Sequence, residues 1–225
     1  MIPSTTNFQN IIVLEGDKTL EKAISKQGLK NVLDYENTNL EKAFSFCRNF
    51  RTAIDVGANY GVLTYHMAKK FNNVQSFEIV NDVRYCLEQN VKKFNLHNVS
   101  VHPCGLGERE ESVALNYNPT STFSTHIAYN EQGNSLIKSL DSFNFEDVDF
   151  IKMDVEGFES FVVCGGLTTI EKYKPVILYE RKIHSERYDN PVNGVLDLLS
   201  PIGYEELDYI GSKNALIGVI DETSI

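Results

Sequence analysis

The heptapeptide DVGANYG, Asp55–Gly61, follows an apolar run, 52–56, and precedes the segment VLTYHMAKK, which has the composition of a helix. A glycine turn between a strand and a helix commonly binds a ligand. Dinucleotide pyrophosphates are bound by G-x-G-x-x-G. Here the pattern is Asp55-x-Gly57-x-x-x-Gly61, so one glycine of that triplet is missing and a carboxylate that would repel phosphate precedes the turn. The turn therefore indicates a ligand that carries an ammonium group and no phosphate.

A second carboxylate, Glu78, follows Asp55 by 23 residues, at the end of the next expected strand. An acidic residue in this place accepts hydrogen bonds from the two hydroxyl groups of a ribose. A nucleoside with an amino-acid tail satisfies both Asp55 and Glu78. The sequence therefore predicts that the cofactor is S-adenosylmethionine.

Strands and helices alternate along the chain. The apolar pattern predicts strands at 52–56, 74–79, 99–103, 148–154 and 175–180, with helices at 60–71, 82–95, 158–173 and 195–200. It also predicts earlier helices at 17–29 and 39–50, extra strands at 112–116 and 135–140, and a closing hairpin of 204–210 with 216–220 turned at 211–214. This order is typical of an α/β fold with a mainly parallel sheet and helices on both faces. We expect a helical N-terminal extension over 1–50 and the main domain over 51–225.

Ligands of such sheets bind beyond the carboxyl ends of the strands. Acidic residues follow four of the five expected strands, namely Asp55, Glu78, Asp154 with Glu156, and Glu180. Cys104 and Gly105 follow the remaining strand, 99–103. The polar loop 118–126 interrupts the alternation of strands and helices. It is either a lid or a surface that binds the acceptor, or a tolerated surface insertion.

Five segments of the chain are informative together, namely AIDVGANYGVLT (53–64), SFEIVNDV (76–83), SLDSF (139–143), VDFIKMDVEGFE (148–159) and KPVILYE (174–180). In these segments the chain resembles the FkbM family of S-adenosylmethionine-dependent O-methyltransferases. The run IKMDVEGFE is the most specific, and the resemblance covers about residues 45–185. One departure is Ile79-Val80, where the family usually has a proline after the Phe-Glu. The resemblance implies a Rossmann-like class I methyltransferase fold, with a seven-stranded sheet whose last strand is antiparallel, and a hydroxyl group, most often of a sugar or glycan, as the methyl acceptor.

The residues expected to bind the cofactor are Asp55, Gly57, Ala58, Asn59, Gly61, Glu78, Ile79, Cys104, Gly105, Leu106 and Asp154. Methyl transfer to a hydroxyl is an in-line displacement that depends on positioning, and the hydroxyl proton must leave during attack. The residues expected near this chemistry are Asp154, Glu156, Glu180 and His184, with His126 as a second candidate base. Alternatively, Asp154, Glu156 and Glu180 could hold a divalent cation that lowers the pKa of the hydroxyl. Ser121, Thr122 and His126 are expected to contact the acceptor, whereas Lys152 could simply pair with an acidic residue.

Composition excludes some functions. The formal net charge of −10 disfavours nucleic acid as a partner. No apolar run reaches the roughly 18 residues of a membrane span, no leader peptide is recognisable, and the four scattered cysteines suit a reduced, cytoplasmic setting. A dehydrogenase is disfavoured by the incomplete glycine triplet. Two alternatives remain, which are O-methylation of a lipid or polyketide-like molecule and a cofactor-binding module without catalysis.

Overall fold

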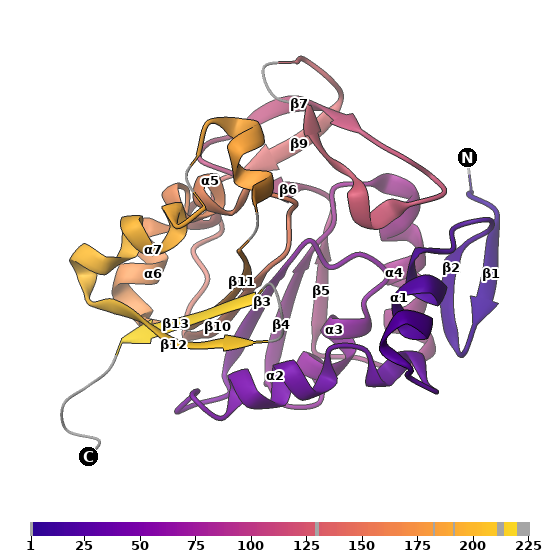
Figure 1. Ribbon diagram of the computed structural model, residues 1–225, viewed down its shortest axis with the longest axis horizontal. Coiled ribbons are helices and arrows are strands. Elements are labelled where there is room, and N and C mark those ends of the chain that lie inside the picture. Colours follow the sequence, from indigo (N-terminus) through magenta and orange to yellow (C-terminus); the bar gives the residue numbers. More distant parts are fainter. Residues whose placement is uncertain (1, 129–130, 182, 191, 211–213, 220–225) are drawn as a thin grey trace.

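The computed structural model describes residues 2–128, 131–181, 183–190, 192–210 and 214–219. Among these residues a central sheet contains seven strands in the order β12-β13-β11-β10-β3-β4-β5 (Figure 1). Their bounds are β3 Thr52–Val56, β4 Asn73–Phe77, β5 Val99–His102, β10 Val148–Met153, β11 Val176–Glu180, β12 Tyr204–Ile210 and β13 Asn214–Val219.

The sheet is mainly parallel, as the sequence predicts. Strands β11, β10, β3, β4 and β5 pair in parallel, whereas β13 is antiparallel to both β11 and β12. The last strand is thus inserted between β11 and β12 in the antiparallel sense that the family resemblance implies. The predicted hairpin turn at 211–214 lies outside the described residues except for Asn214, as does Ile220 at the end of the predicted strand.

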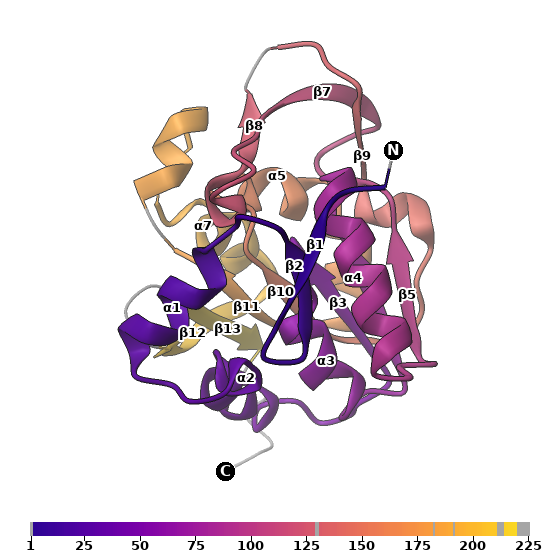
Figure 2. The ribbon, with the colours of Figure 1, turned by 90° about the vertical axis from the view of Figure 1, so that its right-hand side faces the viewer.

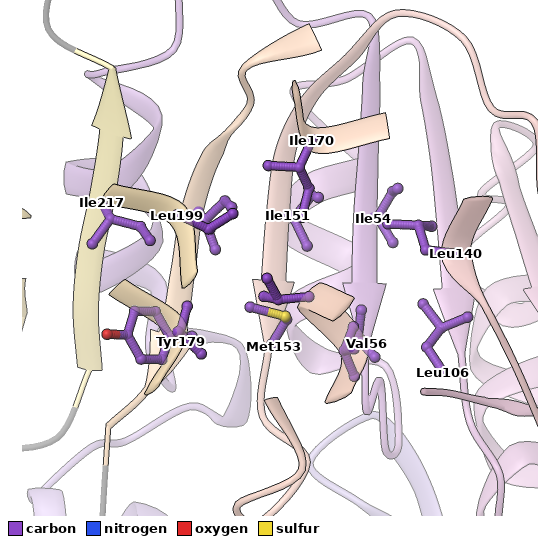
Figure 3. Close-up of a cluster of buried hydrophobic side chains, with 14 of the residues drawn as sticks. Ile54, Val56, Leu106, Leu140, Ile151, Met153, Ile170, Tyr179, Leu199 and Ile217 are labelled. Atoms are coloured by element: carbon purple, nitrogen blue, oxygen red, sulfur yellow. The ribbon is translucent and has the colours of Figure 1, made fainter. Parts of the chain in front are cut away.

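Helices cover both faces of the sheet. On one face Ile54, Ile151 and Ile217 pack with α5 (Glu159–Cys164), α6 (Leu167–Tyr173) and α7 (Gly194–Leu199) in the core drawn in Figure 3. On the other face the sheet packs with α2 (Asn37–Phe44) and α3 (Val62–Ala68), and α4 (Asn81–Lys93) packs beside β5. The helix predicted over 158–173 is divided into α5 and α6 at Gly165-Gly166. A Cβ atom at Gly165 would lie 1.9 Å from the carbonyl oxygen of Gly107, so only glycine allows the two backbones to meet there.

A second, small sheet lies beside the central one, above it in Figures 1 and 2. It consists of β6 (Gly105–Leu106), β7 (Glu111–Asn116), β8 (His126–Ala128) and β9 (Ser135–Lys138), in the order β6-β9-β7-β8. Strands β7 and β9 correspond to the predicted extra strands, whereas β6 and β8 are not among the predicted strands. Short 3-10 helices complete the described chain at η1 Val32–Asp34, η2 Thr122–Ser124, η3 Leu140–Phe143, η4 Ile183–Tyr188 and η5 Ser200–Ile202.

The first 50 residues differ from the predicted helical extension. They contain α1 (Thr19–Gln27) and α2, but they begin with an antiparallel hairpin of β1 (Thr5–Phe8) and β2 (Ile11–Leu14). The side chain of Asn90 on α4 fixes this hairpin, because its Oδ1 accepts from the N–H of Ile12 and its Nδ2 donates to the carbonyls of Ile12 and Tyr60. The segment therefore packs on the main fold (Figure 2), and the domain boundary at residue 50 stays a prediction.

Two global expectations can be compared with the structure. Within the described part of the chain, no helix combines the length and the apolar character needed to cross a bilayer. The four cysteines, Cys47, Cys86, Cys104 and Cys164, are all free thiols, as their spacing predicts.

Candidate active site

A cavity of about 230 Å³ lies at the carboxyl ends of β3, β4 and β10. The glycine turn and the ends of these strands form its floor, and the small sheet with the loop between β7 and β8 covers it. Two side chains of the N-terminal segment, Leu20 and Tyr35, complete the wall. The cavity is thus built from segments that are far apart in the sequence, between Leu20 and Phe158.

The glycines of the DVGANYG turn serve two different contacts. Gly57 has φ +78°, and a Cβ atom there would lie 2.2 Å from the carbonyl oxygen of Asp154. Gly57 therefore joins the loops after β3 and β10 and also lines the cavity. Gly61 has φ +84°, and its Cβ would lie 2.5 Å from Cδ1 of Leu87. It does not line the cavity and makes a packing contact between the start of α3 and α4, so its contact with the cofactor stays a prediction.

Glu78 is a buried acidic group of the cavity wall that two backbone N–H groups hold in place. Its Oε2 accepts from the N–H of Asn59 at 2.9 Å, and its Oε1 accepts from the N–H of Val80 at 2.8 Å. Burial raises the pKa of Glu78, and these two N–H groups oppose the rise by stabilising the carboxylate. Each carboxylate oxygen retains a further lone pair, so Glu78 can accept hydrogen bonds from a ligand without losing its support.

Asp55 is fully buried and does not line the cavity. Its Oδ2 accepts from Oγ1 of Thr64 at 2.6 Å, and its Oδ1 lies 3.6 Å from Nζ of Lys152. Lys152 does line the cavity and also donates to the carbonyl oxygen of Gly57 at 3.3 Å. In the structure Asp55 contacts Lys152, and the direct contact between Asp55 and the cofactor stays a prediction. The suggestion that Lys152 pairs with an acidic residue is confirmed.

Three of the residues predicted near the chemistry gather at one edge of the cavity. Nδ1 of His184 lies 2.8 Å from Oε2 of Glu156. Ligand atoms of Glu156, Glu180 and His184 all lie within 4.8 Å of one another, an arrangement that could hold a metal ion. Asp154 lines the cavity but is not part of this group, so the predicted cation set of Asp154, Glu156 and Glu180 is corrected to one that contains His184. Glu156, with Leu115 and His126, lines both the cavity and the neighbouring surface groove that contains His184.

The loop between β7 and β8 closes over the glycine turn. Oγ1 of Thr122 donates to Oδ2 of Asp17 at 2.7 Å, and the hydroxyl of Tyr60 donates to the same oxygen. His126 lines the cavity, with Nδ1 at 2.9 Å from the carbonyl oxygen of Ser124 and Nε2 at 3.2 Å from Nδ2 of Asn116. A neutral imidazole that donates from Nδ1 accepts at Nε2, so both nitrogens of His126 have partners.

The predicted residues thus divide into two sets. Those that line the cavity are Gly57, Ala58, Asn59, Glu78, Ile79, Gly105, Leu106, Thr122, His126, Asp154 and Glu156. Those that do not are Asp55, Gly61, Cys104, Ser121, Glu180 and His184. Cys104 belongs to the hydrophobic core, which accounts for its burial.

Sequence reasoning missed the wall residues Leu20, Tyr35, Leu115 and Phe123 and the closing residue Asp17. Leu20 could have been found from the sequence, because it lies on the apolar face of a predicted helix and such a face packs against the rest of the fold. Nothing in the sequence indicates the role of Asp17, since its partner Thr122 is 105 residues away.

Comparisons with known proteins agree with this architecture. The sequence matches the methyltransferase FkbM domain over residues 55–210, more than half of the chain. It is 25% identical over 141 residues to "Methyltransferase 1" of Beauveria bassiana, covering 50% of this chain and 57% of that protein. The chain therefore spans little more than half the length of this curated relative.

Solved structures share the fold. The FkbM methyltransferase of Methylobacillus flagellatus superposes with a TM-score of 0.56 at 20% identity, over 76% of this chain and 44% of that one. A methyltransferase-like protein of Streptococcus mutans, solved with SAH, gives a TM-score of 0.51 at 10% identity, over 82% of this chain and 98% of that one. These structures show a Rossmann-like methyltransferase fold, and the sequence match over 55–210 shows that the chain belongs to the FkbM methyltransferase domain family.

Proposed function

We propose that this protein transfers the methyl group of S-adenosylmethionine to a hydroxyl group of a sugar or glycan. The observation that carries the proposal is Glu78, a carboxylate on the cavity wall that is held by the backbone N–H groups of Asn59 and Val80. A carboxylate in this place is suited to both hydroxyls of a ribose. SAH, the ligand of the Streptococcus mutans neighbour, contains such a ribose.

The other walls of the cavity suit the rest of this cofactor. Apolar side chains, among them Ile79, Leu106 and Phe158, form a surface on which an adenine ring can stack. When bound, S-adenosylmethionine supplies a methyl group on a positively charged sulfur. The carboxylates of Asp154 and Glu156, together with Glu78, give the cavity a negative potential that attracts a cation.

The acceptor is proposed to lie in the surface groove next to the cavity. Glu156 lines both spaces, so a hydroxyl in the groove can approach the cavity beside this residue. Amide, hydroxyl and guanidinium groups line the groove, from Asn116, Asn118, Ser124 and Arg187. Such groups hydrogen-bond well to a polyol, which supports a sugar over an apolar acceptor.

His184 is the proposed proton acceptor, and Glu156 its positioning residue. A neutral imidazole that donates from Nδ1 to Glu156 presents its lone pair at Nε2. His184 then takes the hydroxyl proton at Nε2 while the acceptor oxygen gains the methyl group and the sulfur loses it. Glu180, whose ligand atom also lies within 4.8 Å, adds negative charge that favours the imidazolium. His126, whose nitrogens contact Ser124 and Asn116, is the second candidate for this role.

Two experiments test the proposal. Thermal unfolding is measured with SAH, with NAD and with neither. A ligand at 100 times its dissociation constant stabilises a protein by about 2.7 kcal/mol, and we expect that stabilisation with SAH alone, strongly reduced in Glu78→Ala. No stabilisation by SAH would overturn the cofactor assignment.

The second experiment follows methyl transfer from labelled S-adenosylmethionine to a panel of acceptors. The panel contains free sugars, oligosaccharides, and hydroxylated lipid-like and polyketide-like molecules. Transfer to sugars or oligosaccharides is the expected result. Transfer only to the apolar acceptors would reject the sugar assignment, and binding of SAH without any transfer would favour a cofactor-binding module.

A further inference from the structure

Lys152 places a buried ammonium group in the wall of the proposed cofactor cavity. It is 6% exposed and lies on β10, in register with Asp55 on the neighbouring strand β3. Among the cavity-lining residues that the structure describes, Lys152 is the only lysine or arginine. Glu78, Asp154 and Glu156 are the acidic residues of the same wall.

The ammonium group of Lys152 contacts Gly57 and Asp55 and has N–H donors for a further partner. It has three N–H donors, of which one is used by the carbonyl oxygen of Gly57 at 3.3 Å. Oδ1 of Asp55 lies 3.6 Å away, which is an ion-pair distance but longer than a normal hydrogen bond. Asp55 is fully buried and supplies the counter-charge from the side away from the cavity. The pair thus presents its cation to the cavity and hides its anion.

This arrangement determines which charged group can bind beside Lys152, at the end of the cavity where the amino-acid tail of the cofactor is proposed to lie. A free carboxylate is repelled by Glu78, Asp154 and Glu156, and Lys152 is the cation that can compensate it. We infer that Lys152 forms the subsite for the carboxylate of the cofactor's amino-acid tail, with Asp55 as its buried positioning residue. The inference rests on the proposed cofactor. From the sequence, Asp55 predicted that a protein carboxylate contacts the ammonium group of the tail. In the inferred subsite a protein ammonium group, that of Lys152, instead contacts the carboxylate of the tail.

The position of Lys152 relative to the walls supports a contact with the tail. Lys152, Asp154 and Leu63 line the cavity and also a smaller pocket beside α2. The tail would therefore lie between the glycine turn and the end of β10, on the opposite side of that turn from Glu78 and the proposed ribose. A purely structural ion pair between Lys152 and Asp55 would instead be indifferent to the tail of the ligand.

The test compares S-adenosylmethionine with its decarboxylated form, which differs only in the carboxylate of the tail. Dissociation constants are measured by calorimetry for the wild type, Lys152→Met and the double variant Lys152→Met/Asp55→Asn. The double variant removes both charges of the pair, because a lone buried Asp55 would be strongly destabilising. The exposed Lys22 on α1 supplies the control variant Lys22→Met.

We expect the wild type and Lys22→Met to bind S-adenosylmethionine at least about tenfold more tightly than the decarboxylated form, since charge-assisted hydrogen bonds are among the strong ones. In the double variant the two ligands should bind within about twofold, with the affinity for the decarboxylated form retained. Equal binding of both ligands by the wild type, or a preference that persists in the double variant, would overturn the inference. Failure of the wild type to bind either ligand would overturn the proposed cofactor as well, so the two failures are distinguishable.

Discussion

Gly157 and His184 contact each other through their backbones. Gly157 has φ +104°, and a Cβ atom there would lie 2.4 Å from the carbonyl oxygen of His184. The contact brings the loop after β10 against the segment after β11, and it places Glu156 beside the imidazole of His184, with Oε2 and Nδ1 2.8 Å apart. The glycine of the DVEG run thus sets the distance between a carboxylate and a histidine.

Replacement of this glycine is expected to separate the two loops. Gly157→Ala should lower the melting temperature and reduce methyl transfer at least about tenfold, because the reacting groups tolerate little displacement. Gly16→Ala is the matched control, since Gly16 also has positive φ, +85°, but nothing lies within 4 Å of its Cβ position. The control should show only the conformational cost, about 1–2 kcal/mol. Equal losses of activity in the two variants would show that the contact with His184 is unimportant.

Much of the central sheet could be predicted because its signals are local. Apolar runs of five or six residues separated by helical patterns fix the strands, and alternation along each strand fixes the face of every side chain. Asp55 and Lys152 are in register, and Asp154 follows Lys152 by two residues, so a common face for these groups follows from the sequence once the pairing is known. The carboxyl ends of the strands accordingly identified most residues of the cavity floor.

The parts that could not be predicted depend on contacts between distant segments. Strand β1 reads Thr-Thr-Asn-Phe, which has little apolar character, and its hairpin is fixed by Asn90, 78 residues from Ile12. The partners of Asp55 could not be predicted for the same reason. Its side chain meets Thr64 and Lys152 rather than the cavity, and nothing near Asp55 in the sequence announces a lysine 97 positions later.

The histidine of the proposed base is expected to affect turnover and not cofactor binding. His184→Asn removes the lone pair that accepts the hydroxyl proton, and general-base catalysis contributes about 100-fold or more. We expect kcat to fall by about that factor while the dissociation constant for SAH changes less than about twofold, because His184 does not line the cavity. His126→Asn is the comparison, and it should raise KM for the acceptor more than it lowers kcat. A normal kcat in His184→Asn would remove this residue from the mechanism.

A chelator distinguishes the base from a metal ion at the same residues. Glu156, Glu180 and His184 could hold a cation, but Nδ1 of His184 is within hydrogen-bond distance of Glu156. We therefore expect methyl transfer to be unchanged after dialysis against EDTA, with the stabilisation by SAH as a control for the fold. Loss of transfer that Mg²⁺ or Mn²⁺ restores would replace the base mechanism with one in which the cation lowers the pKa of the hydroxyl.

Asp17 is expected to hold the cavity closed. It accepts hydrogen bonds from Thr122 in the covering loop and from Tyr60 in the glycine turn, and hydrogen bonds to a charged group contribute about 1.5–3 kcal/mol. Asp17→Asn should therefore speed the release of SAH about tenfold in stopped-flow displacement, with little change in kcat. The exposed Asp197 on α7 provides the control Asp197→Asn. Identical release rates for both variants and the wild type would show that the loop does not limit exit.

Glu159 should make the stability of the protein depend on pH near neutrality. Its side chain caps the DVEG turn, with Oε1 accepting from the N–H of Val155 at 3.0 Å and of Gly157 at 3.4 Å. Burial raises the pKa of Glu159 to about 7, and the charge of Asp154 adds to the rise. Between the ordinary value of 4.5 and about 7 the folded state binds more protons than the unfolded state, so the free energy of unfolding falls as pH rises through this window and levels off above it. Glu159→Gln keeps the acceptor oxygen but does not titrate. Its free energy of unfolding, measured with urea between pH 5 and 8, should therefore not show this decline. The control is Glu171→Gln, at an exposed site on α6, which should follow the wild type. Parallel curves for the wild type and Glu159→Gln would show that Glu159 does not titrate in this range.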